Sequence, residues 1–312
     1  MERYLITGVN GFVGQHFLKY LDSVDEQIEV VGIGLTALAT GYVPKNYSYR
    51  FEQADILVTD KILKIVNDFL PNYVVHLAAI SSVRESLKEP EKVLVNNLCS
   101  LLGVLIPVQV VLKDRCRILV VGSSEVYAES TEPLNETSPC APKNPYAYSK
   151  FTGETVVNMY CDRMDFDVVM TRSFMHTGTN QNEKFVVASF VKQLTDAKRQ
   201  NKNSAELRTG NIDIIRDITD VRDVVRGYYL LLKRGRRREI YNVCSGTAVS
   251  LRAIIDMASG ILDIPVSIVT DPQRVRPDDI KIVVGSNEKI RKDTGWQPEI
   301  KLEQTLRDMI DG

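Results

Sequence analysis

Near the start of the chain lies the stretch Tyr4–Gly14, YLITGVNGFVG, in which a short apolar run is followed by glycines at positions 8, 11 and 14. The apolar run predicts a buried β-strand, and the amphipathic pattern through Leu21 predicts a helix after the glycines. Such glycines let the backbone turn tightly, approach a pyrophosphate and pack the helix on the strand, while the helix N-terminus attracts phosphate. We expect cofactor contacts from Gly8, Asn10, Gly11, Phe12, Val13 and Gly14. The stretch therefore predicts the first unit of a Rossmann-like, doubly wound α/β fold.

The second predicted strand begins near Ile28 and ends at residues 32–36, GIGLT, where dinucleotide folds select their cofactor. An acid there would bind the ribose of NAD, and an arginine would bind the extra phosphate of NADP. The stretch contains neither, although Lys45 and Arg50 follow downstream. The sequence therefore leaves the choice between NAD(H) and NADP(H) open.

Two later strands add expected cofactor contacts. Asp55 and Ile56 follow the third predicted strand and are expected to lie near adenine. Residues 74–79, VVHLAA, predict another buried strand whose small residues leave room for the bridging phosphates and ribose. From it we expect contacts by Leu77, Ala78 and Ala79. Within this apolar run His76 is expected to be a core histidine, whereas Ser81 opens a loop at the ligand-binding edge.

The residues able to carry chemistry gather between Ile118 and Lys150. The apolar run 118–121 predicts a buried strand, and Ser123, Ser124 and Glu125 follow its carboxyl end, the edge at which such sheets bind ligands.

A helix that starts at Pro145, a residue suited to the first helical position, would place Tyr146 and Lys150 on one face. A free phenol titrates near ~10, and a nearby ammonium would stabilise the phenolate and lower its pKa. Ser123 is expected to hydrogen-bond the same substrate oxygen. The three side chains thus predict an alcohol or ketone site for hydride transfer.

Composition limits the other possibilities. The 312 residues are 44% hydrophobic with a formal net charge of −1, which gives no reason to expect nucleic acid or an anionic membrane as a partner. The five cysteines are scattered and odd in number, so we expect free thiols and no metal site. We expect neither a secretory signal nor an apolar run of membrane-spanning length, which predicts a cytoplasmic protein. The basic segment 233–238, KRGRRR, is expected to be a solvated turn.

Domain organisation follows from a change in polarity. Residues 1–170 are expected to form the NAD(P)-binding domain with its parallel sheet. Between Met175 and Gly210 the chain becomes polar and, we expect, loop-rich. Residues 171–312 should therefore form mainly a smaller α/β substrate-binding domain, with segments that can cross back to the sheet.

Two helices have apolar residues on more than one face. They are the segment Val93–Leu112 and the helix that contains Tyr146. Either both are deeply buried or they form a dimer interface, since exposed apolar surface of this extent usually marks association. We expect a homodimer.

With the glycine loop and the Ser-Tyr-Lys set, the chain resembles the extended short-chain dehydrogenase/reductase family over nearly its whole length. The resemblance implies that the glycine loop binds NAD(P) and that Ser123, Tyr146 and Lys150 carry catalysis. Segments of the C-terminal half are similar to those of the GDP-4-keto-6-deoxymannose reductases, which form GDP-rhamnose. These segments are RDITDVRD (216–223), YNVCSG (241–246), RP (276–277), GSN (285–287) and TGWQP (294–298).

That similarity implies a nucleotide-sugar substrate linked to GDP. Arg216 and Arg276 lie in turn-rich contexts, and arginine forks bind diphosphates bidentately. The expected substrate contacts are Ser81, Ser124, His176, Arg216 and Arg276.

Three positions depart from the family pattern at the substrate edge. The segment 172–176 reads RSFMH, with Met175 where the family has an asparagine; Thr179 stands for the proline of a Gly-Pro, and Ala128 for a glycine. A thioether cannot donate and accept as an amide does. Because the Ser-Tyr-Lys set is intact, these changes suggest a variant sugar.

The expected activity is reversible hydride transfer at C4 of a nucleotide sugar, most simply reduction of a GDP-4-keto-6-deoxy sugar. Glu125 stands where related 4,6-dehydratases carry the base that acts at C5, so the resemblance also leaves a 4,6-dehydratase or 4-epimerase open. A 4-dehydrogenase with tightly bound NAD is a further alternative. A non-catalytic NAD(P) sensor is a minor one, because such proteins often lose the tyrosine-lysine pair.

Overall fold

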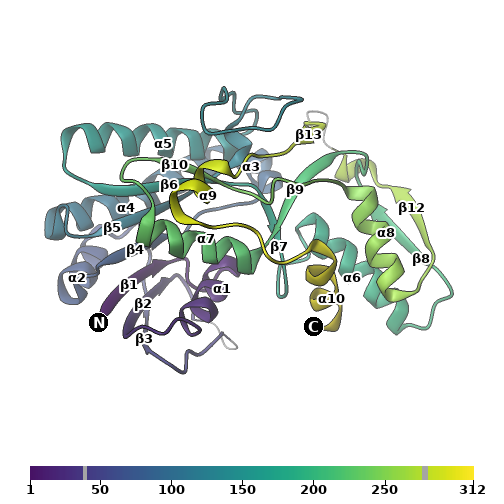
Figure 1. The fold of residues 1–312 in the computed structure, drawn as a ribbon, viewed down its shortest axis with the longest axis horizontal. Coiled ribbons are helices and arrows are strands. Elements are labelled where there is room, and N and C mark those ends of the chain that lie inside the picture. The colour runs from purple at the N-terminus through teal and green to yellow at the C-terminus, as the bar shows by residue number, and fades with distance from the viewer. Residues whose placement is uncertain (38–40, 276–279) are drawn as a thin grey trace.

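Seven parallel strands form the main sheet of the computed structural model, which describes residues 1–37, 41–275 and 280–312 (Figure 1). Their order is β10-β6-β5-β4-β1-β2-β3, so strand order reverses between β1 and β4. The strands are β1 (Glu2–Thr7), β2 (Ile28–Gly34), β3 (Ser48–Gln53), β4 (Tyr73–His76), β5 (Arg117–Ser123), β6 (Asp167–Ser173) and β10 (Ile240–Val243). Ligands of open α/β sheets bind beyond the carboxyl ends at such a reversal. The predicted Rossmann-like fold is confirmed.

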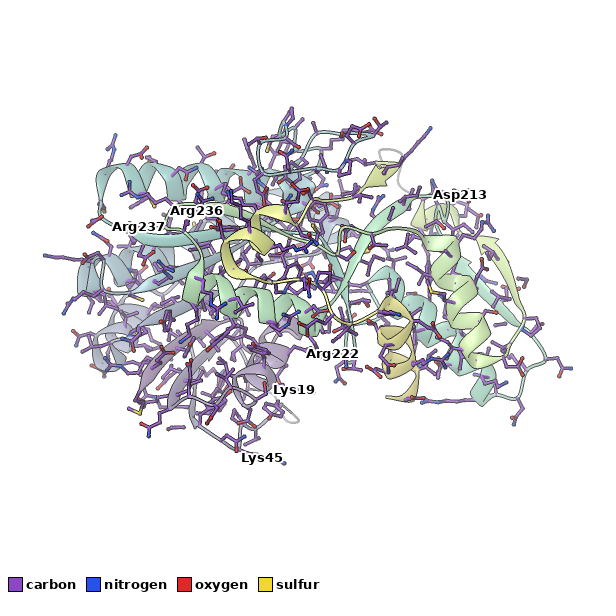
Figure 2. All side chains as sticks on the ribbon, viewed as in Figure 1. Lys19, Lys45, Asp213, Arg222, Arg236 and Arg237 are labelled. Atoms are coloured by element: carbon purple, nitrogen blue, oxygen red, sulfur yellow. The ribbon has the colours of Figure 1, made fainter. Side chains whose placement is uncertain are left out.

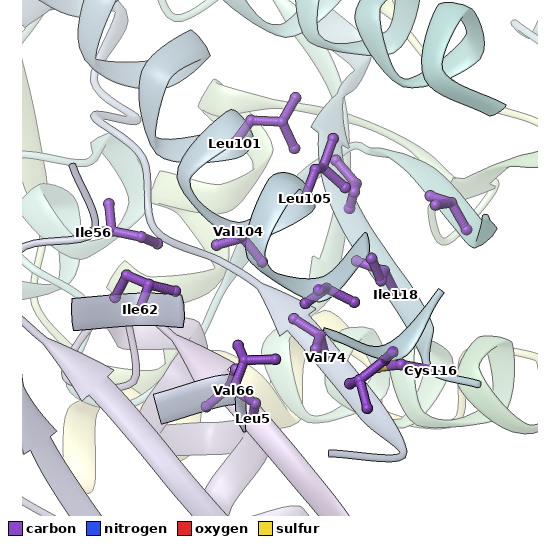
Figure 3. Packing of buried hydrophobic residues seen from close by; sticks show 14 of the residues in the cluster. Leu5, Ile56, Ile62, Val66, Val74, Leu101, Val104, Leu105, Cys116 and Ile118 are labelled. Carbon is purple, nitrogen blue, oxygen red and sulfur yellow. The ribbon is translucent and has the colours of Figure 1, made fainter. Parts of the chain in front are cut away.

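Helices cover both faces of this sheet. One face carries α2 (Thr59–Phe69), α3 (Val83–Lys88), α4 (Pro90–Leu112) and α5 (Pro145–Arg163); the other carries α1 (Phe12–Leu21), α7 (Val221–Arg234) and α9 (Glu288–Thr294). Figure 3 shows the first layer, where Leu101, Val104 and Leu105 of α4 pack over strand residues such as Val74 and Ile118. Both faces are thus buried, which is why central strands such as β4 and β5 contain continuous apolar runs.

A second lobe forms from the remaining elements. A small sheet contains β7 (Met175–Thr177), β9 (Ile215–Asp220), β11 (Ala248–Ser250) and β13 (Ile282–Val283), and β8 (Ala205–Thr209) pairs with β12 (Val266–Thr270). Helices α6 (Val186–Arg199), α8 (Leu251–Leu262) and α10 (Leu302–Asp311) share its apolar core, and the short η2 (Pro272–Arg274) follows β12. Figure 1 shows the C-terminus in this lobe, away from the N-terminus at β1.

Two expectations about local structure are wrong. The loop-rich segment expected from Met175 to Gly210 contains the 14-residue helix α6, which buries Val187, Phe190 and Leu194 at helical spacing. The strand predicted over 74–79 ends at His76. There the Thr7 hydroxyl accepts from Ala78 N at 3.3 Å, so a side chain replaces the ladder.

The expectation that no apolar run could span a membrane is also wrong. By length and composition, α4 is apolar enough, with a mean hydropathy of 1.9 over its best window. Half of that window is buried inside the protein, where α4 packs against α2 and α5. The core helix of a soluble protein can have the same length and apolar composition as a membrane-spanning helix. Val95 (61% exposed) and Val110 (64%) nevertheless remain on its outer face.

In the basic segment 233–238, Lys233 and Arg234 end α7, and residues 236–238 form the exposed turn that follows. Arg236 bonds Asp293 at 2.7 Å, and Arg237 pairs with Asp165. Figure 2 shows Arg236 and Arg237 close together on this surface. The predicted solvated turn is confirmed for residues 236–238 only, because Lys233 is 17% exposed and pairs with Glu2 and Glu26.

Candidate active site

The glycine loop leaves no space for side chains at two positions. Gly8 has φ +67°, and a Cβ there would lie 2.8 Å from Ala78 N. At Gly14 a Cβ would lie 2.5 Å from Val9 O and 2.7 Å from Gly8 O. The loop is therefore packed directly between β4 and the start of α1. Its bare backbone fits the pyrophosphate of a dinucleotide at the helix N-terminus.

At the end of β2, Asn10 reaches across from the glycine loop and donates through Nδ2 to Thr36 O. The described residues that follow β2, 35–37, include no acid and no arginine. Further along, Arg50 pairs with Glu52 at 3.0 Å. The choice between NAD(H) and NADP(H) thus stays open.

The other expected cofactor residues line the same edge of the sheet. The exposed Asp55 accepts from Leu57 N at 2.9 Å, whereas Ile56 is buried beneath α4. Beyond β4, Ala78 and Ala79 line a small cavity together with Lys150. Leu77 packs against the core that contains α1.

Local structure brings Ser123, Tyr146 and Lys150 together. β5 ends at Ser123, and α5 begins at Pro145, where Asn144 Oδ1 caps the helix by accepting from Ala147 N at 2.9 Å. The predicted helix start is confirmed, and Tyr146 hydrogen-bonds Ser123. One turn on, Lys150 Nζ lies 6.0 Å from the centre of the Tyr146 ring and donates to Val121 O at 2.8 Å.

The expected lowering of the Tyr146 pKa is wrong for the protein alone. Burial raises the pKa of Tyr146 to about 12; the hydrogen bond with Ser123 opposes this, and the nearby Glu125 adds to it. The reason is geometric, since the Lys150 ammonium is engaged with a carbonyl and stands off from the phenol. Desolvation of the phenolate therefore outweighs the cation.

Burial acts on the neighbouring bases as well. It lowers the pKa of Lys150 to about 8, although Glu154 raises it. It lowers the pKa of His76 to about 3, with Lys150 adding to the effect. His76 is buried and its Nδ1 lies 3.0 Å from the Thr7 hydroxyl, so the expected core histidine is confirmed.

A cleft at the carboxyl end of β5 holds two of the five expected substrate residues. Its lining includes Ser124 and Glu125 from η1 (Ser124–Val126) and Arg216 from β9. Arg216 donates to the carbonyls of Ile215 and Ile280 at 2.9 and 2.8 Å, which directs it along the cleft wall.

The remaining expected substrate residues are placed differently. Ser81 is exposed in the loop before α3. His176 stands on β7, and its ring stacks on Phe12 of the glycine loop with centroids 6.3 Å apart and planes 5° apart. His176 therefore faces the cofactor loop. Arg276 lies outside the described residues.

Residues missing from the sequence-based prediction also shape the cleft. Asn144 and Lys143 line it, and Asn144 Nδ2 donates to Glu125 at 3.1 Å. Asn144 thus joins the helix cap to the carboxylate. An asparagine directly before the proline that opens a helix is a recognisable N-cap signal, so this residue was detectable. Among the described residues no group of three or more His, Cys, Asp and Glu is placed to hold a metal.

A glycine loop at the strand-order reversal, with a serine, a tyrosine and a lysine beside it, defines the class of nicotinamide-dependent short-chain dehydrogenases/reductases. A family model described as GDP-mannose 4,6 dehydratase matches residues 5–309, so the chain belongs to this family.

Individual relatives and solved structures are consistent with this family assignment. GDP-6-deoxy-D-mannose reductase of Pseudomonas aeruginosa is 33% identical, over 99% of this chain and 96% of the relative. The structure of RMD from Pseudomonas aeruginosa complexed with NADPH superposes with a TM-score of 0.85 at 30% identity, covering 100% of this chain and 98% of that one. UDP-glucose 4-epimerase of Thermus thermophilus in complex with NAD has a TM-score of 0.82 at 25% identity, covering 99% and 98%. The expected family and nicotinamide cofactor are confirmed.

Proposed function

We propose that this protein reduces the C4 carbonyl of a GDP-linked 4-keto-6-deoxy sugar of the mannose type with NADH or NADPH. The observation that carries the proposal is the hydrogen-bonded pair of Ser123 and Tyr146, which lies one helical turn before Lys150 and next in sequence to the cleft residue Ser124. The similarity to a GDP-6-deoxy-D-mannose reductase supports the substrate class.

In the proposed reaction the bound nicotinamide supplies the hydride. Ser123 Oγ orients the C4 oxygen, and Tyr146 Oη gives its proton to the alkoxide that develops there. Lys150 contributes positive charge behind the phenol and binds the ribose. The residues that hold the cofactor are Gly8, Asn10, Gly11, Phe12, Val13, Gly14, Asp55, Ile56, Leu77, Ala78 and Ala79, together with Tyr146 and Lys150.

The raised pKa of Tyr146 suits its proposed role as the proton donor in reduction. At about 12, the phenol holds its proton at neutral pH and starts the cycle as an acid. Oxidation would need the phenolate as a base, which burial disfavours. The Ser123 hydrogen bond is in place to stabilise that phenolate after the proton has left.

For the nucleotide sugar we assign Ser81 and Ser124 to the sugar and Arg216, with Arg276, to the diphosphate. Arg216 lines the cleft, which supports its part of the assignment. We also assign His176 to the substrate contacts; its ring stacks on Phe12, next to the glycine loop. The guanidinium of Arg216 would then bind the anionic diphosphate in the cleft that Glu125 also lines.

The test supplies GDP-4-keto-6-deoxymannose with NADH or NADPH and follows absorbance of the reduced nicotinamide. Consumption of reduced nicotinamide equal to the amount of GDP-6-deoxy sugar formed, together with NMR assignment of the new C4 hydroxyl, supports the proposal. Substrate bound without consumption of either nicotinamide would overturn it. A thermal-shift panel of GDP, UDP, dTDP and CDP identifies the nucleotide independently, because a ligand of the folded state raises the melting temperature.

Glu125 favours a second candidate, a nucleotide-sugar 4,6-dehydratase or 4-epimerase. Its carboxylate is held by Asn144 at 3.1 Å and acts electrostatically on Tyr146, so a base stands beside the C4 acid. These enzymes oxidise and re-reduce within one turnover. Conversion of GDP-mannose or of an epimer without net use of nicotinamide would identify them. Cofactor retained through purification would indicate the 4-dehydrogenase, and ligand binding without any turnover would indicate a sensor.

We also propose a cytoplasmic homodimer formed through α4 and α5. Their outer faces expose apolar side chains that the described chain leaves uncovered: Leu94, Val95, Ile106, Val110, Tyr148 and Met159. Two such faces can cover each other. Sedimentation of wild type and of Val110→Asp tests this, with a monomeric wild type as the contrary result.

A further inference from the structure

A buried ion pair lies directly behind Lys150. Arg172 of β6 forms a fork with Glu154 of α5: Nε bonds Oε1 at 3.0 Å and Nη2 bonds Oε2 at 2.8 Å. Each side chain is only 7% exposed. Breaking such a pair by removing one partner leaves an uncompensated buried charge, so its position next to Lys150 matters electrostatically.

Helical spacing puts the carboxylate at Lys150. Tyr146, Lys150 and Glu154 are each four residues apart on α5 and share one face. Lys150 and Glu154 line the same cavity of about 20 Å³, together with His76. A cavity of that size has room for one water molecule.

The groups that surround Lys150 differ in charge. His76 from β4 is neutral near pH 7, because its Nδ1 contacts Thr7 and burial holds its pKa far down. Tyr146 from α5 keeps its proton. Arg172 from β6 is cationic and bound to Glu154. The Glu154 carboxylate is thus the negatively charged group of this set, and it lines the same cavity as the Lys150 ammonium.

Two further titratable groups act on Tyr146 and not directly on Lys150. Glu125 on η1 and Tyr228 on α7 both interact electrostatically with Tyr146. Tyr228 is buried and its hydroxyl lies 2.7 Å from that of Ser173, so it stays neutral. Their influence falls on the phenol, whereas Glu154 acts on the lysine.

We propose that Glu154 is a positioning residue that keeps Lys150 protonated behind Tyr146, and that Arg172 sets how much of the Glu154 charge reaches the lysine. The proposal rests on the proposed function for its catalytic meaning, but the charge coupling is a property of the folded chain itself.

The coupling has a direct consequence for pH. With a pKa of about 8, Lys150 is close to losing its proton under mildly alkaline conditions. Loss of that proton would remove the positive charge behind the phenol and weaken the hydrogen bond to Val121 O. Glu154 therefore extends the pH range over which the site is charged.

Arg172 connects the Arg172–Glu154 ion pair to the cleft by contacting a residue of the cleft wall. Its guanidinium lies 4.7 Å from the centre of the Tyr127 ring, and Tyr127 lines the cleft. Arg172 Nη1 also donates to Glu136 O at 3.2 Å. A variant at Arg172 can disturb this wall, so the test needs a readout that structural loosening does not produce.

The test measures the Lys150 titration directly, in cofactor-free protein with ¹³C-labelled lysine, by NMR and with Lys150→Arg for assignment. Glu154→Gln should lower the midpoint by about one unit or more, a tenfold change in protonation. Arg172→Gln should raise it, because the freed carboxylate then acts on Lys150 alone. A purely structural role would not shift the midpoint in opposite directions.

Control variants separate charge from folding. Asp167→Asn breaks the part-buried pair with Arg117 (2.9 Å) at the other end of β5 and β6, and should lower stability without moving the Lys150 midpoint. Glu154→Asp keeps the charge and should restore most of the midpoint even if Glu154→Gln folds poorly. An unchanged midpoint in Glu154→Gln, or shifts of both variants in one direction, would overturn the proposal.

Activity then supplies a second measurement. The alkaline limb of kcat/KM should move to lower pH in Glu154→Gln and to higher pH in Arg172→Gln. If the NMR midpoints move as expected but no sugar is reduced, the proposed function fails and the coupling stands. If reduction occurs and the midpoints do not move, the coupling fails alone.

Discussion

Replacement of Gly14 by alanine tests whether the glycine loop is held by close packing. The new Cβ would lie 2.5 Å from Val9 O and 2.7 Å from both Gly8 O and Val9 C. All three are backbone atoms, so no side chain can rotate away. To reach an ordinary contact of about 3.5 Å, the start of α1 must retreat by roughly 1 Å.

The free energy of unfolding should fall accordingly. Overpacking of this kind costs about 1–3 kcal/mol, and the better helix propensity of alanine returns about 0.5–1 kcal/mol. A net loss of about 1–2 kcal/mol corresponds to a melting temperature lower by several degrees, since domains of comparable size lose about 2–4 °C per kcal/mol. Because the helix N-terminus moves with α1, the cofactor that the wild type prefers, NADH or NADPH, should also bind about tenfold more weakly, which corresponds to roughly 1.4 kcal/mol.

Gly260 of α8 is the matched control. A Cβ there has no neighbour within 4 Å, so Gly260→Ala should stabilise the protein by about 0.5–1 kcal/mol through helix propensity and leave the affinity for that cofactor unchanged. Thermal unfolding and fluorescence titration with the same cofactor measure both variants. Wild-type stability and affinity in Gly14→Ala would refute the close packing.

Three further predictions address catalysis, pH and the core. Tyr146→Phe should lower kcat about 100- to 10,000-fold while the protein still binds the preferred cofactor; a wild-type rate would exclude Tyr146 as the proton donor. The His76 pKa, about 3 in the fold against 6.5 unfolded, means that the unfolded chain binds the extra proton between these values, so stability should fall as pH drops below 6.5. At pH 5 the loss from His76 should reach about 2 kcal/mol, and His76→Asn should have a flatter stability profile; parallel profiles would be contrary. Trp296→Phe should reduce the free energy of unfolding by about 1–3 kcal/mol, because the fully buried indole donates through Nε1 to Asp223 O at 2.9 Å. Denaturant unfolding, with an unchanged m-value, measures this loss, and a wild-type free energy of unfolding would contradict the prediction.

Local patterns predicted the parts of the site that depend on neighbours in sequence. The glycine loop follows a strand and opens a helix, and Tyr146 and Lys150 share a face because they are four residues apart. The cap formed by Asn144 was equally local. Helix α6 had the spacing of an amphipathic helix, but its polar face led to the wrong expectation of loops.

Long-range pairing decided what the sequence could not. His176 is expected among the substrate contacts because it belongs to the segment 172–176 that the family resemblance singles out. Parallel pairing of β7 with β9 also stacks its ring on Phe12, more than 160 positions earlier in sequence. No local pattern reports which distant element a side chain meets.

By itself the sequence determined a doubly wound α/β chain with a dinucleotide loop and a Ser-Tyr-Lys set, because apolar periodicity, glycines and helical spacing act over a few residues. Only the tertiary structure decided the electrostatics of that set. Burial raises the pKa of Tyr146, and Lys150 donates to Val121 O without reversing that rise. The charge of Lys150 in turn depends on Glu154 of the same helix and, as proposed, on Arg172 of β6. Burial and charge are sums over everything that surrounds a group, so they exist only once the strands and helices have met.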